Sequence, residues 1–172
     1  MGLSVAIAGG IVMFSLVYIL LMLPGVVDQT TSVTKASSAV SDVENSILKT
    51  NIAMSTFSAT SGSTTMDFTI TNSGTEKLWN YEKFNLIVTY PIAGNTNKTQ
   101  SFTYQSGACV TPAAGKWCIV SITGDNFDPN ILNTNEALNG RLTTSTTPDT
   151  GTAYATISTD VGVTASRTDS TT

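Results

Sequence analysis

The sequence contains no histidine, only two cysteines and few charged residues, which make up 12% of the chain. Without histidine it lacks the commonest general base and metal ligand, and with it every Ser-His-Asp or Cys-His combination. Two cysteines cannot supply the four thiolates of a structural zinc site. The net charge of −4 disfavours non-specific binding to nucleic acid. These absences remove several enzyme and nucleic-acid-binding classes at once.

The twelve acidic residues are scattered singly along the chain. The densest group, residues 124–130, could offer oxygen ligands to Ca²⁺, but it lacks the glycine and the distal glutamate of an EF-hand loop. An Asx-rich turn between strands explains this segment without a metal. No phosphate-binding glycine loop and no paired acid-base carboxylates are present. We therefore predict no catalytic residue, no metal, no cofactor and no enzymatic activity.

Charge is absent altogether from residues 1–27, which are almost continuously apolar. About 20 such residues in a helix span the hydrocarbon core of a bilayer. The alternative, a cleaved secretory peptide, needs a basic start and a small-x-small cleavage site, and neither is found here. We predict a retained helix over residues 1–27, lying in the cytoplasmic membrane or in the core of a filament, and interrupted at Pro24-Gly25 by a kink or a break.

Small residues recur every four positions in this segment, at Gly2, Ala6 and Gly10. On a helix they share one face, where another backbone could approach closely. General abundance of small residues in an apolar helix is the alternative explanation. The spacing predicts a helix-packing face.

Residues 28–51 contain neither glycine nor proline and predict an amphipathic helical neck. Its apolar residues follow a heptad-like spacing, and they are Val33, Ala36, Val40, Val43 and Ile47. Serine and threonine, which fill the other faces, are mediocre helix formers. This helix therefore needs a partner surface, either the rest of its own chain or the same helix of neighbouring subunits.

From residue 52 to residue 172 the apolar period changes to two. Met66, Phe68 and Ile70 alternate with polar residues, and residues 84–90 repeat the pattern. Further strands are predicted near residues 101–105, 117–123, 137–143 and 153–158, separated by Gly-, Asn- and Pro-rich turns. About seven short strands at this spacing predict an antiparallel, Ig-like β-sandwich. The fold class is thus α+β, with a long N-terminal helix before the sandwich.

Cys109 and Cys118 are the two cysteines of the chain. An even number outside a membrane segment predicts a disulfide, closing a hairpin loop between strands near Gln105 and Trp117. Two buried free thiols are the alternative. A catalytic cysteine is disfavoured because no histidine can activate it.

Asn97-Lys98-Thr99 is the one N-x-S/T sequon of the sequence. It falls in a stretch predicted to be a polar loop, where a glycan acceptor is expected. Asn97 is therefore a candidate glycosylation site, although so short a motif also arises by chance.

Two segments carry a family resemblance. Residues 71–90 hold an N-x-G-x-x-x-L turn, from Asn72 to Leu78, that leads into an aromatic-rich strand, and residues 129–136 read PNILNTNE. Together with the helix-stalk-sandwich order, these segments resemble archaeal members of the type IV pilin superfamily, most of all the archaellum accessory proteins F and G. There are two departures. No basic residue precedes the apolar run, so the leader that a prepilin peptidase cuts is either absent or already removed. Val5 stands where bacterial pilins carry an acidic residue, which archaeal relatives commonly lack too.

The resemblance implies a pilin-like architecture and non-enzymatic structural work at the archaeal cell surface. The β-rich part would lie outside the cytoplasmic membrane, acting in a stator-like way or binding surface-layer protein. Expected partners are the membrane, related pilin-like subunits and other copies of this chain as a homo-oligomer. The alternatives are a major pilus or archaellum filament subunit, and a membrane-anchored adhesin whose surface contacts include Trp79 and Tyr81. The aromatic row of such an adhesin would draw on Trp79, Tyr81, Tyr90, Tyr104 and Trp117.

Overall fold

The computed structural model describes residues 2–125 and 127–172 of the chain; within the first helix, the side chains at positions 2, 3, 5, 6, 23, 24, 26 and 27 are outside that description. The chain divides into two compact units, residues 1–44 and Asn45–Thr172. We call the second unit the β-domain.

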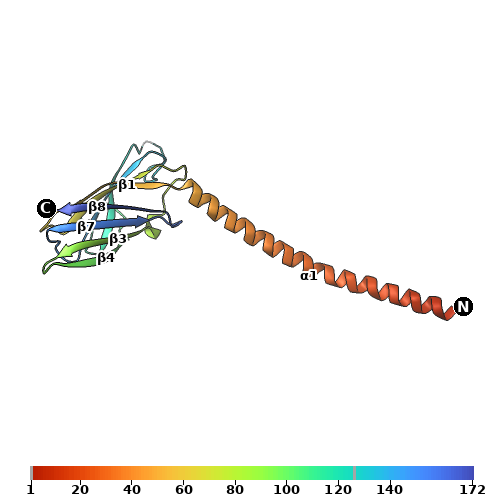
Figure 1. Cartoon of the computed structure of the whole chain (residues 1–172). Coiled ribbons are helices and arrows are strands. Elements are labelled where there is room, and N and C mark those ends of the chain that lie inside the picture. Colours follow the sequence, from red (N-terminus) through yellow and green to blue (C-terminus); the bar gives the residue numbers. More distant parts are fainter. Residues whose placement is uncertain (1, 126) are drawn as a thin grey trace. The chain divides into compact units, whose positions relative to one another are not determined.

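A single helix, α1 (Gly2–Lys49), accounts for 48 residues (Figure 1). At 1.5 Å per residue it is about 70 Å long. The long N-terminal helix expected from the sequence is present, and helix runs through Pro24 and Gly25, so the break expected there as one alternative is absent. The other alternative, a kink, stays a prediction. A proline removes one backbone hydrogen bond without obliging the helix to end.

Eight strands and one short 3-10 helix follow. Their bounds are β1 (Ile52–Ala59), β2 (Thr65–Asn72), η1 (Tyr81–Lys83), β3 (Asn85–Ile92), β4 (Thr96–Tyr104), β5 (Lys116–Thr123), β6 (Ala137–Thr143), β7 (Gly151–Ser158) and β8 (Thr164–Thr171). Figure 1 shows β4, β3, β7 and β8 lying side by side.

The strands form one sheet in the order β1-β2-β6-β5-β4-β3-β7-β8. Most neighbours are antiparallel, but β4 and β5 run parallel, through Thr103 opposite Lys116 and Tyr104 opposite Trp117. The predicted purely antiparallel sandwich is therefore wrong in this respect, and the sheet is mixed. The cause is the segment of residues 105–115, which returns the chain to the start of the next strand instead of making a hairpin turn.

The two ends of the sheet order approach each other. The backbone N–H of Ala59 in β1 donates to Asp169 Oδ2 in β8 at 3.0 Å, and the N–H of Ser61 donates to the carbonyl of Thr172 at 3.3 Å. The sheet thus closes nearly into a barrel. Between β1 and β8, the two hydrogen bonds named above stand in place of a regular ladder of strand pairing. Such closure shields both edge strands from further pairing.

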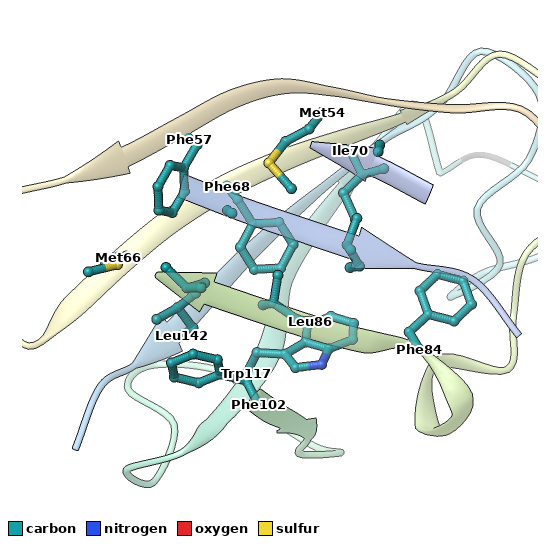
Figure 2. Close-up of a cluster of buried hydrophobic side chains, with 14 of the residues drawn as sticks. Met54, Phe57, Met66, Phe68, Ile70, Phe84, Leu86, Phe102, Trp117 and Leu142 are labelled. Carbon is teal, nitrogen blue, oxygen red and sulfur yellow. The ribbon is translucent and has the colours of Figure 1, made fainter. Parts of the chain in front are cut away.

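The predicted alternation places the core correctly. Met66, Phe68 and Ile70 in β2 are at most 1% exposed, and Leu86, Val88 and Tyr90 in β3 are fully buried. Figure 2 shows the rings of Phe68, Trp117 and Phe102 in one cluster with aliphatic side chains from several strands. The Phe68 and Trp117 rings meet edge to face, with centroids 5.7 Å apart.

Gly140 in β6 leaves room for the Phe68 ring. The two residues are opposite each other in the β2–β6 ladder. A methyl group built on Gly140 would lie 2.3 Å from Phe68 Cζ. Phe68 fills the space that any larger residue at position 140 would occupy, which explains a glycine inside a strand.

We predict that Gly140→Ala destabilises the β-domain by about 1–3 kcal/mol, because the added methyl group overlaps the Phe68 ring. Chemical denaturation followed by circular dichroism measures the change. Phe68→Leu should remove much of that penalty in the double variant, giving a favourable coupling energy. Strictly additive effects would contradict the steric explanation.

The last turn of α1 belongs to the β-domain and is held there by backbone hydrogen bonds. The N–H groups of Thr75 and Glu76 donate to the carbonyl of Lys49, and those of Ser73 and Gly74 donate to the carbonyl of Asn51, just beyond the helix. The carbonyl of Lys49, which has no partner within the helix, thus finds donors in the turn after β2. A methyl group on Gly74 would lie 2.4 Å from both Asn51 N and Lys49 O.

We expect Gly74→Ala to break this junction, because the overlap is with backbone atoms that cannot rotate away. Amide hydrogen exchange at Thr75 and Glu76 should accelerate at least about tenfold relative to wild type. Gly62→Ala is the control for backbone strain without overlap, because φ is +80° at Gly62 and no atom lies within 4 Å of the added methyl group. Unchanged protection at both amides in Gly74→Ala would refute the assignment.

Candidate functional site

The first candidate site is the apolar surface of α1. Its described large apolar side chains between Ile7 and Met22 are all about half exposed or more, with Phe14 at 76% and Leu21 at 74%. Apolar surface this extensive marks a region that another molecule or assembly covers. Within the described residues, no helix combines the length and apolarity needed to cross a membrane. The membrane span predicted for residues 1–27 stays a prediction.

The predicted helix-packing residues divide into two groups. Gly10 has no atom within 4 Å of an added methyl group, so its face is open in the single chain. The side chains of Gly2 and Ala6 lie outside the described part. Among the neck residues, Val33, Val40, Val43 and Ile47 are 41–68% exposed, and Ala36 is also exposed. The stripe is therefore unpartnered in a single chain, and its packing role remains a prediction.

Cys109 and Cys118 form a disulfide, as the cysteine count predicts, with Cα atoms 5.7 Å apart. The predicted hairpin around it is wrong, because Cys118 lies in β5, which runs parallel to the preceding strand. The disulfide attaches the segment of residues 105–115 to the sheet. Further bonds hold that segment: Gln105 Oε1 accepts from the N–H of Ala113, and the carbonyl of Val110 accepts from Arg141.

Asn97 lies in strand β4, opposite Pro91 of β3, and not in the loop that the sequence predicted. The hairpin turn is shorter than expected because Thr96 and Asn97 already pair. Asn97 is exposed, so glycosylation there stays a prediction.

The two predicted surface aromatics have different environments. Trp79 is 65% exposed, whereas Tyr81 is 5% exposed. The Tyr81 hydroxyl donates to the carbonyls of Leu78 at 3.0 Å and Asn130 at 3.2 Å. Tyr81 is thus a core residue and the predicted surface contact is wrong for it. Tyr90 and Trp117 are fully buried as well, which removes most of the aromatic row that an adhesin would need.

The second candidate site is an open cavity of about 790 Å³ in the β-domain. The segment around η1 lines it with residues 79–82, and β5 lines it with residues 119–122. Tyr104, Gly107, Asp125 and Asn130 complete the lining. We call this cavity the Trp79 groove.

A chain of aromatic contacts connects the Trp79 groove to the core. Tyr81 contacts Phe84 and Tyr104, with centroids 5.4 and 5.8 Å apart, and Tyr104 contacts Trp117 at 4.9 Å. The wall of the groove is therefore set by rings that are themselves packed in the domain. Because Gly107 belongs to the segment of residues 105–115, the disulfide also helps to position this wall.

Asp125, in the lining of the groove, has one carboxylate oxygen without a hydrogen-bond partner among the described residues. Its Oδ2 accepts from the N–H of Asn130 at 3.2 Å. Its Oδ1 is shielded from solvent and has no hydrogen-bond partner among the described residues. The Asx-rich turn expected for residues 124–130 gave no indication of this unsatisfied oxygen. No group of three or more metal-ligating side chains occurs among the described residues.

Burial and charge raise the pKa values of two tyrosines in the groove. Desolvation raises the pKa of Tyr81 above its ordinary value, and the charge of Asp125 adds to the effect. Desolvation likewise raises the pKa of Tyr104, with a contribution from Glu82. Both hydroxyls stay protonated at neutral pH, so the negative charge of the groove comes from its two carboxylates.

We predict that the β-domain loses stability as the pH rises above about 10. Each tyrosine has a higher pKa in the folded state than in the unfolded state, so folding favours its protonated form. That contribution to stability is complete below the pKa of the unfolded state and is lost progressively as the pH rises above it. Denaturation midpoints measured between pH 8 and pH 11.5, with tyrosinate absorbance at 295 nm, test this. Tyr81→Phe should flatten the dependence, and a stability independent of pH in the wild type would contradict it.

Comparison with known proteins gives structural neighbours only. No family model matches the chain, and no curated protein matches it significantly. It is similar to the archaellum periplasmic stator protein FlaG from Sulfolobus acidocaldarius, at 20% identity and a TM-score of 0.47, covering 70% of this chain and 99% of that one. It is also similar to a chain of the archaellum periplasmic stator protein complex FlaF and FlaG from the same organism, at 18% identity and a TM-score of 0.49, covering 69% of this chain and 87% of that one.

Similarity of this size does not show a shared family. The resemblance expected from residues 71–90 and 129–136 was to archaellum accessory proteins, and these two solved structures, to which the chain is similar, are archaellum stator proteins.

Proposed function

We propose that this protein is a non-enzymatic structural component of an archaeal cell-surface motility apparatus, with the role of an archaellum accessory protein. The β-domain would act outside the cytoplasmic membrane, in a stator-like way or against surface-layer protein. Its partners would be related pilin-like subunits and other copies of this chain.

The observation that carries the proposal is the exposed apolar surface of α1 on a helix whose C-terminus is hydrogen-bonded into a β-domain. Apolar side chains such as Phe14 and Leu21 are unfavourable in water and favour burial against other helices or lipid. The last turn of α1 is hydrogen-bonded within the β-domain, at Lys49 and Asn51. This combination suits a part that is anchored at one end and makes contacts at the other.

Two further features support a location at the cell surface. The disulfide between Cys109 and Cys118 is typical of proteins outside the reducing cytoplasm. Residues 1–27 carry no charge, which suits the cytoplasmic membrane or a bundle of related helices.

Deleting the gene in its host tests the accessory role. We expect loss of swimming while filaments remain visible by electron microscopy, with motility restored by the wild-type gene. Absence of all filaments after deletion would instead indicate that this chain is the filament subunit.

The filament subunit is the second candidate, favoured by the open face at Gly10. Helices without lipid between them must bury one another, and small residues allow the closest approach. We predict that Gly10→Leu blocks assembly of purified chains into fibres but leaves the β-domain folded. Gly9→Leu, the same change one residue away on another face, should assemble normally.

Negative-stain images and circular dichroism of both variants give the result. Equal assembly of Gly10→Leu and Gly9→Leu would contradict a packing role for the Gly10 face. Failure of both would show that added bulk anywhere on α1 is harmful, which also contradicts a role specific to that face.

A further inference from the structure

The Trp79 groove combines an exposed aromatic side chain, fixed in position by its neighbours, with negative charge that no nearby positive group balances. It belongs entirely to the β-domain, so a ligand bound there is independent of the proposed role of α1. Three lining residues provide the relevant chemistry: Trp79, Glu82 and Asp125.

The side chain of Trp79 is exposed, although the residues before and after it in the chain are held in place by hydrogen bonds. Leu78 pairs with Leu132 through reciprocal backbone bonds of 3.1 and 2.8 Å, and Tyr81 is anchored by its hydroxyl. Leu78 and Tyr81 are 3% and 5% exposed, whereas the indole between them is 65% exposed. A well-placed indole that remains in water offers a flat apolar and π-rich surface to a ligand.

Glu82 and Asp125 make the groove acidic. Glu82 is exposed and forms no salt bridge with any described residue. Asp125 Oδ1 is shielded from solvent without a donor, so its charge is less screened than that of a surface carboxylate. No lysine or arginine is among the described lining residues. The groove therefore lacks a positive group to balance its two carboxylates.

We propose that the Trp79 groove binds an exposed arginine side chain of a partner protein. The guanidinium stacks on the indole of Trp79, and its N–H groups donate to the exposed carboxylate of Glu82. The charge of Asp125, whose Oδ1 is shielded from solvent, adds attraction without a direct hydrogen bond. Arginine suits this site because its planar cation both stacks on aromatic faces and donates several hydrogen bonds. A neutral sugar could stack on Trp79, but it would leave the two negative charges uncompensated.

The fluorescence of Trp79 provides a direct test. The other tryptophan, Trp117, is fully buried, so a change on adding a ligand reports chiefly on Trp79. The full chain in a non-ionic detergent is titrated with a short acetylated peptide holding one arginine between glycines. The controls are the same peptide with citrulline, which is isosteric but neutral, and a neutral oligosaccharide.

We expect a saturable fluorescence change with the arginine peptide and at least about tenfold weaker binding of the citrulline peptide. Raising the salt concentration from about 50 to about 500 mM should weaken the arginine peptide several-fold, because the attraction is between charges. Equal binding of both peptides would overturn the proposal. So would binding of the oligosaccharide alone, which would indicate a glycan site, or no binding of any probe.

Variants locate the site by calorimetry, which needs no tryptophan. Trp79→Ala and Glu82→Gln should each weaken the arginine peptide at least about fivefold. Asp125→Asn, which removes charge but no direct contact, should weaken it by a smaller factor of about two. Phe127→Ala and Asp160→Asn are matched controls, since both residues are exposed and neither lines the groove. Circular dichroism confirms folding of each variant. Unchanged affinity in both Trp79→Ala and Glu82→Gln would refute this site.

Discussion

The short parallel contact between β4 and β5 is the constraint on which the β-domain depends. It joins the antiparallel group β1-β2-β6-β5 to the antiparallel group β4-β3-β7-β8 through two residue pairs. Two ladder pairs alone contribute little, so the side chains must secure the join. Trp117, at one of these pairs, contacts both Phe68 of β2 and Tyr104 of β4, and the adjacent Cys118 is cross-linked to Cys109. Aromatic packing and a disulfide bond thus stabilise the contact between β4 and β5, for which two ladder pairs alone are too weak.

The same join shapes the Trp79 groove. Tyr104 contacts both Trp117 and Tyr81, so the groove wall is an extension of the core. A site built in this way is pre-organised, because its rings are packed before any ligand arrives. Phe84 and Phe68 stand at the two ends of this aromatic series. The groove and the fold therefore share one set of contacts, and loss of the disulfide would affect both.

Much of this architecture could be predicted from the sequence because it depends on local pattern. Period-two alternation identified the buried faces of β2 and β3, and the uncharged start identified a long helix. The strand β8 was not predicted because Ala165 is its one apolar residue, so its sequence shows no alternation of apolar and polar residues. The parallel pairing was not predicted either, since a loop of residues 105–115 can serve a hairpin or a return crossing, and only long-range packing decides between them.

The Trp79 groove could not be predicted from the sequence for a different reason. Trp79 and Tyr81 are two residues apart and look equivalent in the sequence, yet one is exposed and the other buried. What separates them is the distant carbonyl of Asn130, which accepts from the Tyr81 hydroxyl, and the pairing of Leu78 with Leu132. Asp125 likewise resembles an ordinary turn residue until the fold brings it to the groove that Tyr81 also lines. Functional chemistry in this protein thus arises where segments far apart in the sequence meet, and such a meeting is a property of the tertiary structure, which no single motif encodes.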